Sequence, residues 1–137
     1  MNLIEATQAG DINSVKHLLD NDNNHCFDTS HDEKGYTEFH WAAYFDEVAI
    51  LELLLSNKPS KGIQLSNRKM SCLHIAVLNN SIGSIKSLLE SKIGSNIVNL
   101  KNCWGETALH LASSIGKKTF KKSFYFGRIQ QIKYFKI

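Results

Sequence analysis

Apolar residues recur along this chain in short clusters with helical spacing. One cluster consists of Ile50, Leu51, Leu54 and Leu55, and a later one of Ile82, Ile85, Leu88 and Leu89. Residues three and four apart share one face of a helix, so each cluster predicts a short amphipathic helix. A shorter apolar stretch precedes each cluster, F-H-W-A-A at 39–43 and L-H-I-A-V at 73–77. The chain is therefore predicted to contain repeated pairs of short helices.

A polar motif marks the start of the first helix in each pair. His40, His74 and His110 follow one another at intervals of 34 and 36 residues. Each has a hydroxyl residue three positions earlier and an alanine two positions later. A hydroxyl before an apolar stretch is typical of a helix N-cap. Near the N-terminus, Leu3 and Ala6 repeat the apolar part of the motif, with Ile4 in place of histidine.

This combination of period, paired helices and T-x-x-H-x-A motif resembles the ankyrin repeat family. The resemblance implies an all-α ankyrin-repeat solenoid of about four helix-turn-helix units with short hairpin-like turns. Residues 1–116 are predicted to form the array, with units at about 2–31, 32–65, 66–101 and from 102 to 116 onward. A polar loop is expected at 21–32 and a further loop at 91–99, and the first helix of the last unit is expected to end at Gly116.

Some residues depart from the family pattern. Asp46 and Asn80 replace the glycine that ends the first helix, and Lys69 replaces the glycine of a turn. Asp and Asn tolerate left-handed backbone better than most residues do. Glu38 stands where the family usually has proline, and an acidic residue is favourable at a helix N-terminus.

The resemblance also divides the remaining residues into structural and binding ones. Each histidine is expected to bond the hydroxyl residue of its own unit and the backbone of a neighbouring unit; the pairs are Thr37 with His40, Ser71 with His74, and Thr107 with His110. Turn tips and the exposed side of the first helices are expected to bind a partner; these residues are Glu33, Lys34, Tyr36, Tyr44, Phe45, Asn67, Arg68, Met70, Leu78, Asn79, Cys103, Trp104, Glu106 and Ser114.

The aromatic residues in that set favour a protein partner, because aromatic side chains supply a large contact area for few lost rotamers. Two interpretations fit Phe45 and Trp104: each is either exposed in the groove or packed between units. Trp41 is predicted to lie in the core, since Ile75 and Leu111 occupy the equivalent positions.

An enzyme, a metal site and a bound cofactor are not expected. The chain lacks G-x-x-x-x-G-K-[ST], G-x-G-x-x-G, G-x-S-x-G and H-E-x-x-H. Equivalent histidines on packed helices should stand about 10 Å apart, too far to share one metal ion. Cys72 lies two residues before His74, but their side chains should leave the helix in different directions. His25, Cys26 and His31 fall in a solvated loop.

The C-terminal segment 117–137 differs from the array in charge. Residues 1–116 carry 13 acidic and 9 basic side chains, whereas the last 21 residues carry seven basic ones and no acid. Six aromatic residues are interleaved with these cations, which include Lys117, Lys118, Lys121, Lys122 and Arg128. Nucleic-acid or anionic-membrane binding through this tail is therefore the alternative function. Two conformations fit it: an insertion at 117–126 followed by a delayed helix at 128–137, or one amphipathic helix from Lys117.

Three scattered cysteines and the absence of a basic, apolar leader predict an intracellular protein of a reducing compartment, the cytoplasm. We expect a monomer. The sequence as a whole predicts a non-catalytic interaction module that binds another protein through the concave groove of the repeats.

Overall fold

The computed structural model describes residues 2–21 and 31–118, and it is all-helical over this part of the chain. This confirms the predicted fold class. The elements are α1 (Leu3–Gln8), α2 (Ile12–Asn21), α3 (Glu38–Tyr44), α4 (Val48–Asn57), η2 (Pro59–Ile63), α5 (Cys72–Leu78), α6 (Ile82–Glu90), α7 (Gly94–Ile97) and α8 (Ala108–Lys118). No helix in the described ranges is long and apolar enough to cross a bilayer.

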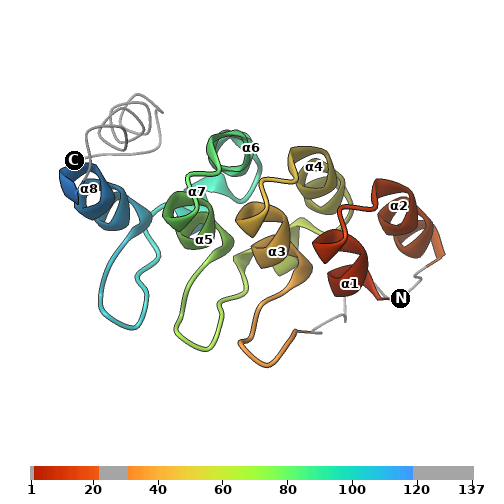
Figure 1. Ribbon diagram of the computed structural model, residues 1–137, viewed down its shortest axis with the longest axis horizontal. Coiled ribbons are helices and arrows are strands. Elements are labelled where there is room, and N and C mark those ends of the chain that lie inside the picture. Colours follow the sequence, from red (N-terminus) through yellow and green to blue (C-terminus); the bar gives the residue numbers. More distant parts are fainter. Residues whose placement is uncertain (1, 22–30, 119–137) are drawn as a thin grey trace.

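The main helices stack in two layers (Figure 1). Helices α1, α3, α5 and α8 pack side by side in one layer, and α2, α4 and α6 pack side by side in the other. Helices α1, α3 and α5 also pack on the second helix of their own pair, α2, α4 and α6 respectively. The connections before α3, α5 and α8 project as turns along one edge of the molecule (Figure 1). The architecture is a solenoid in which each pair of helices buries its apolar face on its neighbours.

The T-x-x-H motif forms a reciprocal cap at the start of the first-layer helices. Thr37 Oγ1 accepts a hydrogen bond from the Phe39 N–H (3.2 Å), and His40 Nδ1 accepts one from the Thr37 N–H (3.0 Å). Ser71 and His74 repeat the arrangement, with the His74 N–H donating to Ser71 Oγ (3.2 Å). Histidine therefore takes the place that glutamate or glutamine has in a capping box.

Left-handed residues end the first-layer helices. Gly10 (φ 69°), Asp46 (φ 54°) and Asn80 (φ 56°) hold equivalent positions in the first three pairs. Asp46 adds a contact between pairs, because its Oδ1 accepts from the Ser84 N–H (3.0 Å) and Oγ (2.8 Å). In the last pair, α8 continues through Gly116 to Lys118. The predicted end at Gly116 is therefore wrong.

The core is one continuous cluster of buried side chains from all four first-layer helices and from α2, α4 and α6. Its largest fully buried members include Phe39, Leu54, Leu73 and Leu88. A fully buried leucine or phenylalanine contributes about 1.5 to 3 kcal/mol relative to an exposed one. Stability of the array therefore depends on contacts between successive pairs.

The connection at 91–99, which the sequence predicted to be a loop, is partly helical. It contains α7, and Ile93, Ile97 and Val98 are buried. Gly94 lies so close to the end of α6 that an added Cβ would be 2.3 Å from the Leu89 carbonyl oxygen. The apolar residues of the segment lack a long periodic pattern, which is why the sequence did not reveal this short helix.

Glu38 has a second role that the sequence did not reveal. Its carboxylate is buried with Lys61 Nζ at 2.6 Å from Oε1 and Lys58 Nζ at 3.5 Å from Oε2. Both lysines are also buried. This ion cluster joins the first turn of α3 to η2, which follows α4.

Candidate functional site

The turns before α3, α5 and α8 share one hydrogen-bond pattern. Each turn opens with a residue whose side-chain oxygen accepts the backbone N–H four positions later: Asp32 from Tyr36 (2.9 Å), Ser66 from Met70 (3.1 Å) and Asn102 from Glu106 (3.0 Å). The backbone N–H of each opening residue donates to the carbonyl of that same later residue, at 2.9 Å in all three turns. This explains the Asp, Ser or Asn at these positions, since these residues are typical of turns.

Neighbouring turns are joined through their backbones. The Asn67 N–H donates to the Lys34 carbonyl (3.0 Å), and the Cys103 N–H donates to the Arg68 carbonyl (2.9 Å). Asn67 Nδ2 adds a bond to the Glu33 carbonyl (2.8 Å). Lys34, Arg68 and Trp104, which hold the same position in successive turns, therefore follow one another along the edge seen in Figure 1.

Four aromatic side chains of the second pair form a continuous surface, which we call the aromatic cluster: Tyr36, Trp41, Tyr44 and Phe45. The Trp41 ring is 5.2 Å from Tyr36, 5.4 Å from Tyr44 and 5.8 Å from Phe45 between centroids. Tyr44 and Phe45 are 4.9 Å apart and remain 41% and 47% exposed. Trp41 Nε1 donates to Asp32 Oδ2 (2.9 Å), which fixes the indole against the turn.

A depression lies between the turns of the second and third pairs. It is lined by Glu33, Lys34, Tyr36, Ser66, Asn67, Arg68 and Met70. Six of these seven residues are in the predicted partner-binding set. The structure thus brings together residues from two turns that are 34 positions apart in the sequence.

The third turn carries an exposed indole. Trp104 is 60% exposed, and the Arg68 guanidinium lies over its ring, with Cζ 5.5 Å from the ring centroid. A cation over an aromatic face is attracted by the ring quadrupole, by about 0.5 to 1 kcal/mol at an exposed site. Both Phe45 and Trp104 are therefore surface residues rather than packing between pairs.

Two buried histidines connect first-layer helices to the turn of the next pair: His40 of α3 contacts the turn before α5, and His74 of α5 contacts the turn before α8. His40 Nε2 lies 2.8 Å from the Met70 carbonyl oxygen, and His74 Nε2 lies 2.8 Å from that of Glu106. A backbone N–H contacts each Nδ1, and a carbonyl can only accept, so both rings are the neutral tautomer with the proton on Nε2. Burial lowers the pKa of His40 to about 4, and burial likewise lowers the pKa of His74.

The third histidine has the same contact with its own unit but a different environment. His110 Nδ1 accepts from the Thr107 N–H (3.1 Å), and its side chain is exposed.

A family model for ankyrin repeats (three copies) matches residues 3–99, more than half of the chain. The chain belongs to the ankyrin repeat family. One relative, the nuclear factor NF-kappa-B p105 subunit of Gallus gallus, is 39% identical to this chain over 83 residues. That match covers 59% of this chain but only 8% of the relative.

A solved structure also resembles the ankyrin fold described here. The crystal structure of the yeast ribosomal protein Rps3 in complex with its chaperone Yar1 contains a chain that matches with a TM-score of 0.71. The two chains are 18% identical, and the match covers 92% of this chain and 89% of that one. At this identity the match supports the fold alone.

Most of the predicted partner-binding residues are exposed or half-buried on the turns or at the ends of the first-layer helices of the ankyrin units. Exposed ones are Glu33, Lys34, Tyr44, Phe45, Asn67, Arg68, Leu78, Asn79, Cys103, Trp104 and Ser114, and half-buried ones are Tyr36 and Glu106. Leu78 is 42% exposed and Asn79 donates to the Ile75 carbonyl (2.9 Å).

Two predictions about side-chain position are wrong. Met70 is only 7% exposed: its flexible side chain folds under the next turn, where Sδ accepts from Asn102 Nδ2 (3.4 Å). Trp41 was predicted in the core but is only partly buried. Ile75 and Leu111 are buried at the equivalent positions, whereas the larger indole extends outward to reach Asp32.

The described residues give no support to catalysis at Cys72. Its thiol is buried, donates to the Gly62 carbonyl (3.4 Å), and has a pKa raised by burial to about 12. A thiol with so high a pKa supplies almost no thiolate nucleophile near neutral pH. Among the described residues, no group of three or more His, Cys, Asp and Glu side chains could hold a metal ion.

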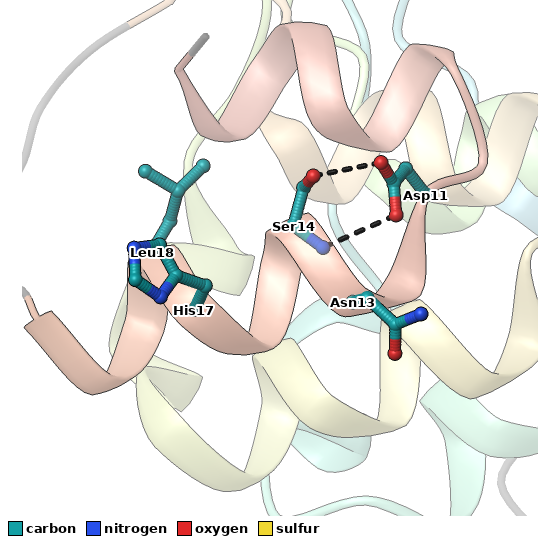
Figure 2. A pocket seen from close by; sticks show the side chains of 5 residues that line it. All are labelled: Asp11, Asn13, Ser14, His17 and Leu18. Atoms are coloured by element: carbon teal, nitrogen blue, oxygen red, sulfur yellow. Dashed lines mark hydrogen bonds between the residues drawn. The ribbon is translucent and has the colours of Figure 1, made fainter.

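Another surface depression lies on α2, in the second layer of helices, formed by α2, α4 and α6, which we call the outer layer. Figure 2 shows its lining residues Asp11, Asn13, Ser14, His17 and Leu18. Asp11 accepts from the Ser14 hydroxyl (2.7 Å) and N–H (3.2 Å), bonds that lower the pKa of Asp11 and close the first turn of the helix. These polar groups are thus occupied in capping, which makes the turns and the aromatic cluster the stronger candidate site.

The predictions about the loop that includes His25 and Cys26, and about the conformation of the tail beyond Lys118, lie outside the described residues.

Proposed function

We propose that this ankyrin chain is a protein-protein interaction module that binds its partner on the side formed by the turns and the first-layer helices. The observation that carries the proposal is the aromatic cluster. Tyr44 and Phe45 are exposed in a folded chain, yet their rings pack on Trp41, which in turn packs on Tyr36. Rigid, exposed aromatic residues are the side chains that most often dominate binding free energy.

A second feature, the depression between the turns, favours this side of the molecule as the binding surface. The depression between the turns opens beside Tyr36, so apolar and polar contacts are available in one place. Ankyrin repeats in general act as non-catalytic interaction modules, and a buried Cys72 thiol agrees with that. The matched structure is a complex of a ribosomal protein with its chaperone, which is consistent with protein binding.

Site-specific photocrosslinking would test the binding side. A photoreactive phenylalanine analogue in place of Phe45 should crosslink a partner protein in the native cell extract. The same analogue in place of Lys86, which is exposed on α6 in the outer layer, is the matched control. Crosslinking from position 86 but not from position 45 would place the interface on the opposite layer and contradict the proposal.

The identified partner then permits a quantitative test. Replacing Tyr44 and Phe45 together by alanine should weaken binding by about tenfold or more, because truncation of anchor aromatics costs at least about 1 to 2 kcal/mol. Their exposure predicts a small change in the melting temperature. A double variant that binds as well as the wild type would show that the cluster is not the anchor.

The basic tail supports a second proposal, nucleic-acid or anionic-membrane binding. It rests on the composition of residues 117–137, with seven cations and no acid. Affinity for phosphates should fall steeply with salt concentration, whereas affinity mediated by aromatic anchors should change little. Removal of residues 119–137 should abolish binding to nucleic acid or anionic membranes and leave binding to the protein partner unchanged.

A further inference from the structure

The turns present a cationic row along the edge of the array. Lys34, Arg68 and Lys69 are exposed there, and the backbone bonds between turns place the first two on adjacent tips. We call Lys34, Arg68, Lys69 and Trp104 the tip row. Within the described residues, none of its three cations forms an ion pair. Their charges are thus available to a ligand.

The acidic residues nearest the tip row are mostly engaged within the protein. The Asp32 carboxylate accepts three hydrogen bonds, from the N–H groups of Lys34 and Tyr36 and from the Trp41 indole. Glu106 is half-buried and accepts from Asn102 Nδ2 (3.2 Å). Glu33 is the exposed acid on these tips. The row is locally basic, although residues 1–116 have an excess of acidic side chains.

Arg68 is suited to recognition of a carboxylate. Its guanidinium lies over the Trp104 ring, with Cζ 5.5 Å from the ring centroid, and the side chain is exposed, so its N–H groups can be reached by a ligand. A planar guanidinium can donate two parallel hydrogen bonds to one carboxylate, which are stronger than neutral hydrogen bonds. Holding the side chain on the indole reduces the rotamer entropy that binding would otherwise cost.

The backbone at Lys69 adds an independent observation. Its φ is 60°, in the left-handed region where the equivalent Gly35 and Gly105 lie at 78° and 76°. A non-glycine residue there costs about 1 kcal/mol or more. The turn thus contains a cation at a position that favours glycine on conformational grounds.

We propose that the tip row binds an acidic segment of the partner protein, with Arg68 as its main anchor and an apolar residue of the same segment in the depression beside Tyr36 and Met70. This deepens the proposed protein-binding function and rests on it. A short acidic segment can bind at the tips alone, where among the described residues three cations outnumber the single exposed carboxylate of Glu33. A long polyanion such as a nucleic acid would also extend along a net-acidic array, where repulsion opposes binding.

Fluorescence anisotropy would test this with a defined probe, a labelled peptide of alternating aspartate and leucine. The peptide should bind the full chain, and Arg68→Gln should weaken binding by about tenfold, the loss typical of one charge-assisted pair. Glu33→Gln should strengthen it by a few-fold. Lys86→Gln, with the same charge change on the outer layer, is the control and should bind like the wild type. Circular dichroism confirms that each variant is folded.

Three outcomes would overturn the inference. Equal losses in Arg68→Gln and Lys86→Gln would show that net charge, not the tip row, determines binding. Tighter, Arg68-dependent binding of a single-stranded oligonucleotide would assign the row to nucleic acid. Crosslinking of a partner from position 45, with partner affinity unchanged by Arg68→Gln and Trp104→Leu, would leave the proposed function intact and remove the acidic-segment inference.

Discussion

Lys61 Nζ lies 2.6 Å from Glu38 Oε1, and both side chains are buried. Charges removed from water require a partner, and loss of one partner from a buried pair is costly. Glu38→Gln, which keeps the side-chain shape and removes the charge, should lower the free energy of unfolding by about 3 kcal/mol. Urea denaturation measures this. Glu90→Gln, at an exposed acid on α6, is the control, and equal stability of the two variants would contradict the prediction.

Substitution of Lys69 by glycine is predicted to increase stability, whereas substitution of Glu38 decreases it. Because its φ is 60°, Lys69→Gly should relieve strain and raise the free energy of unfolding by about 1 kcal/mol. Lys69→Ala removes the same charge but keeps a Cβ, so it should change stability by less than about 0.5 kcal/mol. Denaturant midpoints of the two variants provide the comparison. If alanine stabilises as much as glycine, removal of charge rather than backbone strain is the cause.

The buried histidines predict that stability decreases in mild acid. His40 is neutral when folded and has a pKa lowered to about 4, against about 6.5 in the unfolded chain. Above pH 6.5 neither state binds the proton. Between about 6.5 and 4 the unfolded state binds it preferentially, so the free energy of unfolding should fall by up to about 1.4 kcal/mol per pH unit. His74, whose pKa is also lowered, should act in the same direction.

Nuclear magnetic resonance can assign this pH effect to its source. The His40 ring signals should remain those of the neutral form throughout the range from pH 7 down to the onset of unfolding. Urea midpoints across the same range should decrease less steeply in His40→Gln than in the wild type. Titration of the His40 ring near its ordinary pKa in the folded protein would be inconsistent with its burial.

Gly94 is predicted to tolerate no side chain. Because an added Cβ would be 2.3 Å from the Leu89 carbonyl oxygen, Gly94→Ala must displace α7 from the end of α6. We expect a loss of about 2 kcal/mol, typical of overpacking. Ser95→Ala, at the next and exposed position, should change the melting temperature little. Equal thermal melts of these two variants would show that α7 shifts freely.

The sequence predicted the parts of this fold that repeat. The T-x-x-H motif predicted the starts of α3 and α5, because hydroxyl and histidine act within four residues of each other. Asp46, Lys69 and Asn80 were predicted at glycine positions, and all three have positive φ. Local chemistry determines each of these features, so one sequence suffices to detect them.

Features that join distant segments were not predictable in the same way. Nothing in the local sequence pairs Glu38 with Lys58 and Lys61, since only the packing of α3 against η2 brings them together. The burial of Met70 and Trp41 was predicted wrongly, because equivalent positions in the units predict only where the backbone lies. Burial also depends on the next turn, which covers Met70, and on side-chain size, since Trp41 is larger than Ile75 and Leu111. The placement of Arg68 over the Trp104 ring likewise needs two turns in contact.

Backbone hydrogen bonds from Asn67 to Lys34 and from Cys103 to Arg68 set the spacing between neighbouring turns. This spacing therefore does not depend on which side chains the turns carry at their tips. Main-chain atoms make these bonds, so side chains at 34, 68 and 104 can be exchanged without altering the distance between neighbouring tips. Substitutions at these three positions can therefore change which partner is bound while the backbone of the turns stays the same. A combinatorial library at these sites should therefore yield variants with redirected specificity that unfold at nearly the parental temperature.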